Sequence, residues 1–473
     1  MAHNKFLPRV LAAAAAMMLL AGCSSKADPG FSPANPVNIT IWTYYNGEQL
    51  EAFNALVDEF NSTVGKEQGI TVESSSHGSV TDLENNVLAS AEGKVGAEAM
   101  PNIFSAYADT AYALDEMGQI ADLSDYLSEE DRAAFIEDYL SEGDFSGSGS
   151  IKIFPVAKSA ELLFLNETDW EPFAAATGAT YDDLATIEGL VSVAERYYEW
   201  TDAQTPDIPN DGRAFFGRDA MANYMLIGAK QLGCTIFAAQ GGSMTLNFDH
   251  DAVRTLWDNY YVPFIKGYFS ASGRFRSDDV KTGNIIAYVG SSSSATFFPT
   301  QVIADDMDSH DITRKALESP KFANGEDYAV QQGAGMVVTK ASDAEIQASL
   351  VFLKWFTSPE HNITFSVDSG YLPVTHEGNS IDAIRISGLA LSDEMDEVLS
   401  AAVDTVNENS GGTNARAILE YSMSDKASAD RAAVKEAMAQ GQSFEEASAQ
   451  FLSDKCFEVW YQDTLASLEA FQG

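Results

Sequence analysis

Residues 37–118 alternate between strand and helix patterns, and this alternation limits the possible fold more than any other feature of the sequence. Apolar and polar residues take turns along 37–43, which predicts a strand, and residues 50–60 repeat apolar side chains at helical spacing. A strand at 70–72, a helix at 83–91, a strand at 103–107 and a short helix ending at Gly118 follow. Such alternation predicts a parallel sheet with right-handed crossovers. Ligands of these sheets lie beyond the carboxyl ends of the strands.

The second half of the chain carries a polar strand end and an aromatic segment. Residues 285–289 form an apolar run that predicts a buried strand, followed by Gly290 and four serines, 291–294. Such a turn can bind a phosphate or a sugar hydroxyl, although serine-rich turns without a ligand are equally common. Trp200, Phe215 and Phe216 stand among turn-forming residues, where a loop could present them to a ligand. Aromatic side chains in helices usually belong to the core.

The first 22 residues have the layout of a secretory signal. Lys5 and Arg9 precede an apolar run, 10–20, that is too short to cross a bilayer. The run ends in Leu20-Ala21-Gly22-Cys23, which resembles the bacterial lipobox, in which the cysteine is lipidated and becomes the new amino terminus. We therefore expect a lipoprotein signal peptide at 1–22, a lipid anchor at Cys23 and a flexible tether at 23–36. An ordinary cysteine near a signal peptide is the alternative.

The charge and the cysteine count exclude several classes of function. Seventy acidic and 28 basic residues give a formal net charge of −42, which repels nucleic acid and anionic lipid. Beyond the signal, no apolar run reaches membrane-spanning length, so a soluble body is expected. If Cys23 is lipidated, Cys234 and Cys456 either form one disulfide or stay separate buried thiols, the alternative we favour. The six histidines show no metal-ligand spacing, and we expect no metal and no cofactor.

Four segments in this order resemble the bacterial extracellular solute-binding proteins, family 1, of ABC importers, above all the glycerol-3-phosphate and maltose-type binders: 39–42, 151–166, 286–294 and 352–374. The resemblance implies a two-lobed α/β fold, with parallel-sheet lobes joined by a hinge that the chain crosses three times. The crossings would lie near 155–159, 313–319 and 368–371. The first lobe would comprise 37–155 and 318–367, and the second 156–317 and 368–473.

The same resemblance implies a set of ligand-binding residues between the lobes. Positions that match cleft residues of the glycerol-phosphate binder are Ser159, Ser291 or Ser292, Gly333, Tyr371 and Arg416, the last matching an arginine that grips the phosphate. Positions that stand where that binder has other cleft side chains are Ser79, Asp109, Phe216 and Arg218. The strand ends add Trp42, Tyr44, Tyr45, Glu48 and Tyr107 to the expected set.

The expected function is binding without chemistry. A monomeric, lipid-anchored receptor outside the cytoplasmic membrane would capture a carbohydrate or a sugar or polyol phosphate and deliver it to the permease of an ABC importer. The alternative is a secreted carbohydrate-active hydrolase that uses two carboxylates. The sequence has no Gly-x-Ser-x-Gly motif for a serine nucleophile. An adhesive or structural lipoprotein is a third possibility, for which a two-lobe pattern is unnecessary.

Overall fold

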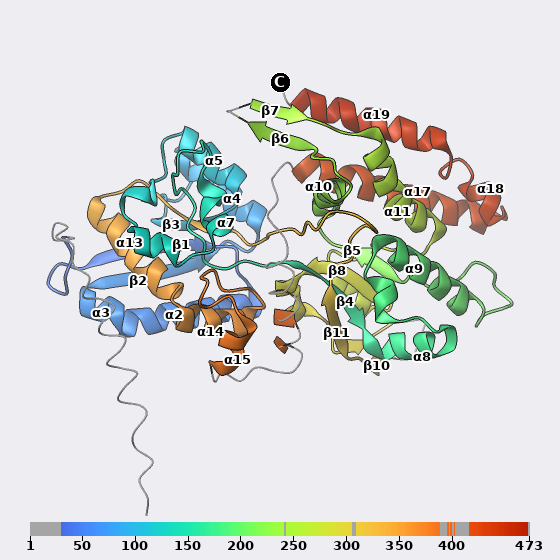
Figure 1. Cartoon of the computed structure of the whole chain (residues 1–473), viewed down its shortest axis with the longest axis horizontal. Coiled ribbons are helices and arrows are strands. Elements are labelled where there is room, and N and C mark those ends of the chain that lie inside the picture. The colour runs from blue at the N-terminus through green and yellow to red at the C-terminus, as the bar shows by residue number, and fades with distance from the viewer. Residues whose placement is uncertain are drawn as a thin grey trace, which may run out of the picture.

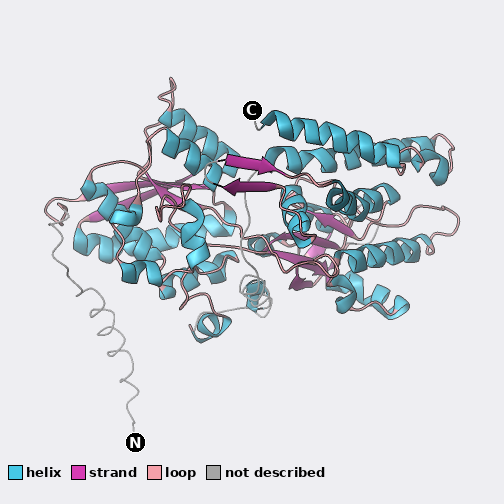
Figure 2. Cartoon of the chain, turned by 45° about the horizontal axis from the view of Figure 1, so that its top comes forward, coloured by secondary structure: helices cyan, strands magenta, loops and turns pink. Residues whose placement is uncertain are grey.

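The computed structural model describes residues 30–240, 243–304, 309–387, 395, 396, 398, 399, 402 and 416–471. The predicted signal peptide and Cys23 lie outside these residues. Figure 1 shows two lobes side by side, with chain segments passing between them. In Figure 2 helices flank the central sheet of each lobe. The two-lobed solute-binding fold expected from the sequence is confirmed.

The first lobe is built on a four-stranded sheet with the order β12-β3-β1-β2. The alternation expected for 37–118 is confirmed, and β1 pairs in parallel with β2 and β3, for example at Ile41 and Ile103. The elements of this lobe are β1 (Val37–Thr43), α2 (Gly47–Ser62), α3 (Val64–Gln68), β2 (Ile70–Ser76), α4 (Val80–Ala91), β3 (Ile103–Ala106), α5 (Ala108–Glu116), η1 (Leu123–Asp125), α6 (Glu129–Ala133), α7 (Glu137–Leu140), η2 (Ser141–Gly143), β12 (Gly335–Val338), α13 (Asp343–Phe356) and α14 (Pro359–Ser369).

The second lobe has a four-stranded sheet with the order β11-β4-β8-β5. Helices α17 and α19, near the carboxyl end of the chain, pack against α10 and α11 of this lobe. Its elements are β4 (Glu161–Asn166), α8 (Glu167–Thr177), η3 (Tyr181–Leu184), α9 (Ile187–Asp202), β5 (Phe216–Arg218), α10 (Met221–Gln231), β6 (Phe237–Gln240), β7 (Ser243–Leu246), α11 (His250–Lys266), α12 (Arg276–Lys281), β8 (Ala287–Ser291), η4 (Ser292–Phe297), β9 (Gln301–Val302), β10 (His310–Asp311), β11 (Arg314–Glu318), α17 (Arg416–Ala439), α18 (Phe444–Ser448) and α19 (Asp454–Phe471). The short helix α15 (Ile381–Ile386) is drawn below α14 in Figure 1.

Neither sheet is wholly parallel, contrary to the expectation. β12 runs antiparallel to β3, and β4 runs antiparallel to both β8 and β11. The reason is the hinge: β4 and β12 each follow a crossing, so they start between the lobes and run outward. β1, β2, β3, β5 and β8 run the other way, and their carboxyl ends face the space between the lobes, where ligands of such sheets bind.

Three chain segments pair with one another at the hinge. Phe154 pairs with Met336, Lys158 with Leu372, and Ser159 with Gln332. The crossing predicted near 313–319 is wrong, because β11 lies in the second sheet beside β4; the chain passes between the lobes near Gln332 instead. The third crossing also comes later than 368–371, because Thr375 still pairs with Phe135 of the first lobe.

The aromatic residues of 197–216 belong to the core of the second lobe. Phe215 is fully buried, Phe216 packs edge-on against Phe269 with ring centroids 4.9 Å apart, and Trp200 packs against Phe173. The expectation that loops present these three side chains to a ligand is therefore wrong, because the turn-forming residues flank a β5 strand that faces the core. Cys234 and Cys456 are both free thiols, and Cys456 is half-buried. In the described part of the chain no helix is long and apolar enough to cross a membrane.

Candidate ligand-binding cleft

A cleft of about 940 Å³ opens between the lobes. Its wall on the first lobe comes from the segment after β1 and from the start of α4, and Tyr371 joins it from the hinge. Its wall on the second lobe comes from the segments around α12, η4 and β9. The lining residues are Tyr44, Asn46, Gln49, Gly78, Ser79, Val80, Asp219, Arg274, Phe275, Ser277, Asp278, Lys281, Ser293, Ser294, Phe297, Pro299, Thr300, Gln301, Ile303 and Tyr371.

The strand ends position the side chains of this cleft. Tyr44 follows β1 directly, Asp219 follows β5, and the serines of η4 follow β8. Ser79 caps the N-terminus of α4, since its hydroxyl accepts a hydrogen bond from the Asp82 amide at 3.1 Å. Local structure therefore brings a hydroxyl group to the cleft edge on each lobe.

Two tyrosines meet where the first lobe joins the hinge. The hydroxyl oxygens of Tyr44 and Tyr371 lie 3.4 Å apart, and the Ala334 amide donates to the Tyr44 hydroxyl at 3.4 Å. Burial, and then the neighbouring tyrosine, raise the pKa of Tyr44 well above its usual value, and burial also raises the pKa of Tyr371. Both phenols are therefore neutral at physiological pH and can donate or accept hydrogen bonds.

The serines of η4 connect the second lobe to the hinge. The Ser291 hydroxyl donates to the Ser159 hydroxyl at 3.0 Å and lies 2.9 Å from that of Ser293. Ser292 points inward, and its hydroxyl donates to the Gly370 carbonyl at 2.9 Å. Of the four serines, Ser293 and Ser294 line the cleft.

Apolar side chains stand on the rim of the second lobe. Phe275, Phe297 and Ile303 are 52%, 48% and 53% exposed, although all three line the cleft. Phe297 also approaches the first lobe, since a Cβ atom added to Gly47 would lie 3.7 Å from its ring. Exposed aromatic faces beside hydroxyl and amide groups are the usual lining of a small-molecule site.

Asp219 is an acidic group between the cleft and a buried arginine. The Arg276 amide donates to its carboxylate at 3.2 Å, and the Arg276 Nε lies 3.6 Å away, while the guanidinium also pairs with buried Asp279 at 2.5 Å. Burial outweighs these contacts and raises the pKa of Asp219 to about 6.

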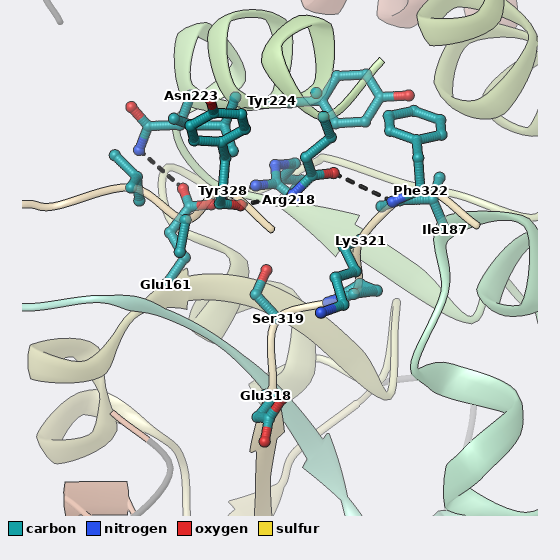
Figure 3. A pocket seen from close by; sticks show the side chains of 16 residues that line it. Glu161, Ile187, Arg218, Asn223, Tyr224, Glu318, Ser319, Lys321, Phe322 and Tyr328 are labelled. Atoms are coloured by element: carbon teal, nitrogen blue, oxygen red, sulfur yellow. Dashed lines mark hydrogen bonds and ion pairs between the residues drawn. The ribbon is translucent and has the colours of Figure 1, made fainter. Parts of the chain in front are cut away.

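A smaller hollow of about 50 Å³ lies beside α10 in the second lobe (Figure 3). Glu161 and Arg218 form an ion pair there, and both side chains are only 6% exposed. The Asn223 amide donates to Glu161 at 2.8 Å, and the Arg218 guanidinium lies over the Tyr224 ring at 5.4 Å. The hollow has room for about one or two water molecules but not for a sugar ring.

Lys158 ties the three hinge segments to the first lobe. Its backbone pairs with Leu372, and its ammonium donates to the Gly333 carbonyl at 2.9 Å and forms an ion pair with Glu142. Two residues later, the Ala160 carbonyl accepts from the Ser292 amide of the second lobe at 2.7 Å. The first crossing therefore changes lobes within three residues, 158–160.

The model of one protein family, the bacterial extracellular solute-binding proteins, matches residues 55–384. This is more than half of the chain. The protein belongs to this family. The family expected from the sequence is thus confirmed, and its members are binding proteins. A search of curated protein sequences finds no significant match.

Several solved structures are similar to this solute-binding protein in fold. One is a binding protein for cyclic α-maltosyl-1,6-maltose from Arthrobacter globiformis (17% identity, TM-score 0.63, covering 87% of this chain and 96% of that one). A second is UgpB from Mycobacterium tuberculosis in complex with glycerophosphocholine (17%, 0.63, 91% and 99%). A third is Lmo0181 from Listeria monocytogenes in complex with cycloalternan (14%, 0.62, 92% and 99%). At these identities the likeness concerns the fold alone.

The residues predicted to bind ligand fall into distinct places in the solute-binding protein. Those that line the cleft are Tyr44, Ser79 and Tyr371. Those at the hinge or the smaller hollow are Ser159, Ser291, Ser292, Gly333 and Arg218. Those at helix starts outside the cleft lining are Glu48, Tyr107 and Asp109. Those buried in the cores are Trp42, Tyr45 and Phe216. Cys23 and the Arg416 side chain lie outside the described residues.

Most residues of the second-lobe wall of the cleft were not predicted from the sequence. Arg274, Phe275 and Ile303 come from irregular segments and Phe297 ends the short helix η4, so no periodic pattern marks them, and only their apolar or charged character in turn-rich sequence could have drawn attention to them. Asp219 was missed although it follows Arg218 directly. The strand-end principle that selected Tyr44 would have selected it, had β5 been recognised.

Proposed function

We propose that this solute-binding protein is the lipid-anchored receptor of an ABC importer and captures a carbohydrate between its lobes. The observation that supports this most is the cleft of about 940 Å³ lined by side chains of both lobes. That volume lies at the upper end of the range for small-molecule sites, roughly 300–1,000 Å³, and suits an oligosaccharide better than glycerol phosphate.

The chemistry of the lining also favours a polyhydroxy solute. Hydroxyl and amide groups stand on both walls, among them Asn46, Ser79 and Gln301. Each can replace a hydrogen bond that a sugar hydroxyl loses on leaving water. The rings of Phe275 and Phe297 offer apolar faces to the CH groups of a sugar ring. A solute that touches both walls can drive hinge closure, because it binds the closed state better than the open one.

The ligands of the structural neighbours support the same class of solute. Two of the three neighbours above are described with cyclic oligosaccharides, and the third with glycerophosphocholine. A sugar or polyol phosphate is therefore the second ligand class to test. The solute would be released unchanged to the permease, so a glycoside that the protein hydrolyses would contradict the proposal.

We expect Tyr371→Phe to weaken solute binding by about 0.5–1.5 kcal/mol, the usual contribution of one hydrogen bond, without unfolding the free protein. The solute is first identified by thermal shift with a panel of linear and cyclic oligosaccharides and glycerophosphocholine, since a ligand of the folded state raises its stability. Calorimetry then gives the affinities. Tyr421→Phe is the matched control, because Tyr421 is 61% exposed on α17. Equal affinities in all three proteins would remove Tyr371 from the site.

We expect Cys23→Ser to abolish lipid attachment and to leave the precursor uncleaved, because the cysteine is the acyl acceptor of a lipobox. Metabolic labelling with a fatty-acid analogue in a bacterial host measures this, and cell fractionation shows whether the protein leaves the membrane. Equal labelling of the wild type and the variant would exclude the anchor, while the carbohydrate screen would remain valid for the soluble part.

A further inference from the structure

The N-terminus of α10 lies at the edge of the cleft. Asp219, two residues before the helix, lines the cleft, and Asn223 in its first turn lines the smaller hollow and binds Glu161. Figure 3 shows Asn223 and Arg218 together above Glu161. The corner between β5 and α10 therefore sets where these side chains stand.

This corner has an unusual backbone and no cap of its own. Ala220, the N-cap residue, adopts φ +49° and ψ +67°, a left-handed conformation that costs an L-residue free energy unless its surroundings impose it. Its side chain makes no capping hydrogen bond, and the first turn of α10 contains no acidic residue. The free amides of a helix N-terminus carry a partial positive charge and attract anions.

A carboxylate from the far end of the chain occupies this position. Glu420, on α17, accepts hydrogen bonds from the Met221 amide at 3.1 Å and from the Ala222 amide at 2.9 Å. Each of its two oxygens binds one amide, and the partners lie 198 and 199 residues away in sequence. Met221 and Ala222 are both buried and Glu420 is half-buried, so without Glu420 the two amides would lose their partner at a position that solvent reaches from the side of Glu420.

The two buried arginines next to this corner are also engaged. Arg218 pairs with Glu161, and Arg276 pairs with Asp219 and Asp279. An anionic group of a solute that entered here would be repelled by the carboxylates of Asp219 and Glu420. It could not bind the helix amides, because Glu420 already does. A neutral hydroxyl group meets no such repulsion.

We infer that the Glu420 carboxylate stabilises the β5–α10 corner in the conformation that binds solute. It also prevents phosphate and carboxylate groups of a solute from binding to the N-terminus of α10. The inference rests on the proposed function, which it narrows to solutes that are neutral at this end of the cleft. Glu420 is a positioning residue, because it acts through the helix and not by touching the solute.

Chemical rescue by small anions tests the inference without any carbohydrate. Thermal melts compare Glu420→Ala with wild type in sodium chloride, sodium acetate and sodium phosphate at equal ionic strength and neutral pH. We expect Glu420→Ala to melt about 3–6 °C below wild type in chloride, as loss of the two amide contacts requires. Acetate should recover at least half of that difference, because its carboxylate fits the vacated site. Phosphate should stabilise the variant more than it stabilises wild type.

Two further variants distinguish anion binding at the vacated Glu420 position from a general salt effect on stability. Glu436→Ala removes the same charge from the same helix, but Glu436 is exposed and accepts a hydrogen bond from the Gln440 side chain at 3.2 Å, away from α10, so its response to acetate should equal that of wild type. Glu420→Gln keeps one acceptor oxygen and fills the site, so it should melt between wild type and Glu420→Ala and gain nothing extra from acetate.

An unchanged melting temperature in Glu420→Ala, or the same acetate response in all four proteins, would overturn the inference. If Glu420→Ala does not fold, Glu420→Gln decides, because a melting temperature equal to wild type would contradict a charge-dependent contact. A failed carbohydrate screen would contradict the proposed function but leave this result untouched.

Discussion

Arg218→Met lowers the free energy of unfolding by about 3–5 kcal/mol, the usual loss when one partner of a buried ion pair is removed. Glu161 and Arg218 are both buried, and Glu161 then keeps Asn223 as a hydrogen-bond donor but loses the opposite charge. Methionine has nearly the same length as the arginine stem, so the loss of packing contributes little. Urea denaturation followed by circular dichroism measures the change.

The double variant Glu161→Gln/Arg218→Met is the control for Arg218. It removes both charges and keeps an amide that can still accept from Asn223, so it should lose clearly less stability than Arg218→Met alone. If Arg218→Met stays within about 1 kcal/mol of wild type, Glu161 is solvated or neutral in the variant, and the ion pair does not stabilise this part of the second lobe.

Gly333→Ala lowers the free energy of unfolding by about 2–4 kcal/mol, from a strained backbone and a collision. Gly333 adopts φ +93°, and a Cβ atom there would lie 2.6 Å from the Ala157 carbonyl oxygen and 3.1 Å from the Lys158 Cα. Both are backbone atoms of the first hinge crossing, so neither can turn aside. The variant should also weaken solute binding, because the second crossing must move away from the first.

Gly233→Ala separates the two causes of this loss of stability, the backbone strain and the collision with the first crossing. Gly233 has a similar conformation, φ +80°, but a Cβ atom there would meet nothing within 4 Å, so its loss of stability reports backbone strain alone, about 1–2 kcal/mol. The difference between the two variants measures the close contact of the crossings. Equal losses would show that the hinge accommodates the extra atom.

Most elements could be predicted because their patterns are local. β1, α2, β2, α4, β3 and α5 appear in the predicted order. A period of 2 or 3.6 residues shows itself within a dozen positions. The orientation of the strands could not be predicted in the same way, because it depends on which strand follows a hinge crossing.

The candidate site could be predicted only where it follows a strand end or the hinge turn. Tyr44 was found from the end of its strand, and Ser79 and Tyr371 from the resemblance to the glycerol-phosphate binder. Trp42 and Tyr45 were not distinguished from Tyr44, because the end of β1 is buried on both faces and burial there no longer alternates along the strand. The side chains that reach the cleft belong to residues after the strand, where the alternation of the strand no longer applies.

The sequence by itself determined the strands and helices of residues 37–118, since short-range periodicity is enough for these, and its resemblance to the solute-binding proteins implied the family and the two-lobed fold. Only the tertiary structure decided the rim of Phe275 and Phe297, the ion pair of Glu161 with Arg218, and the placement of Glu420 on α10. The members of these two pairs, Arg218 with Glu161 and Met221 with Glu420, lie 57 and 199 residues apart, and no local pattern records such a distance. Folding of the chain brings them together, because the hinge crossings and the packing of α17 against α10 fix which segments become neighbours.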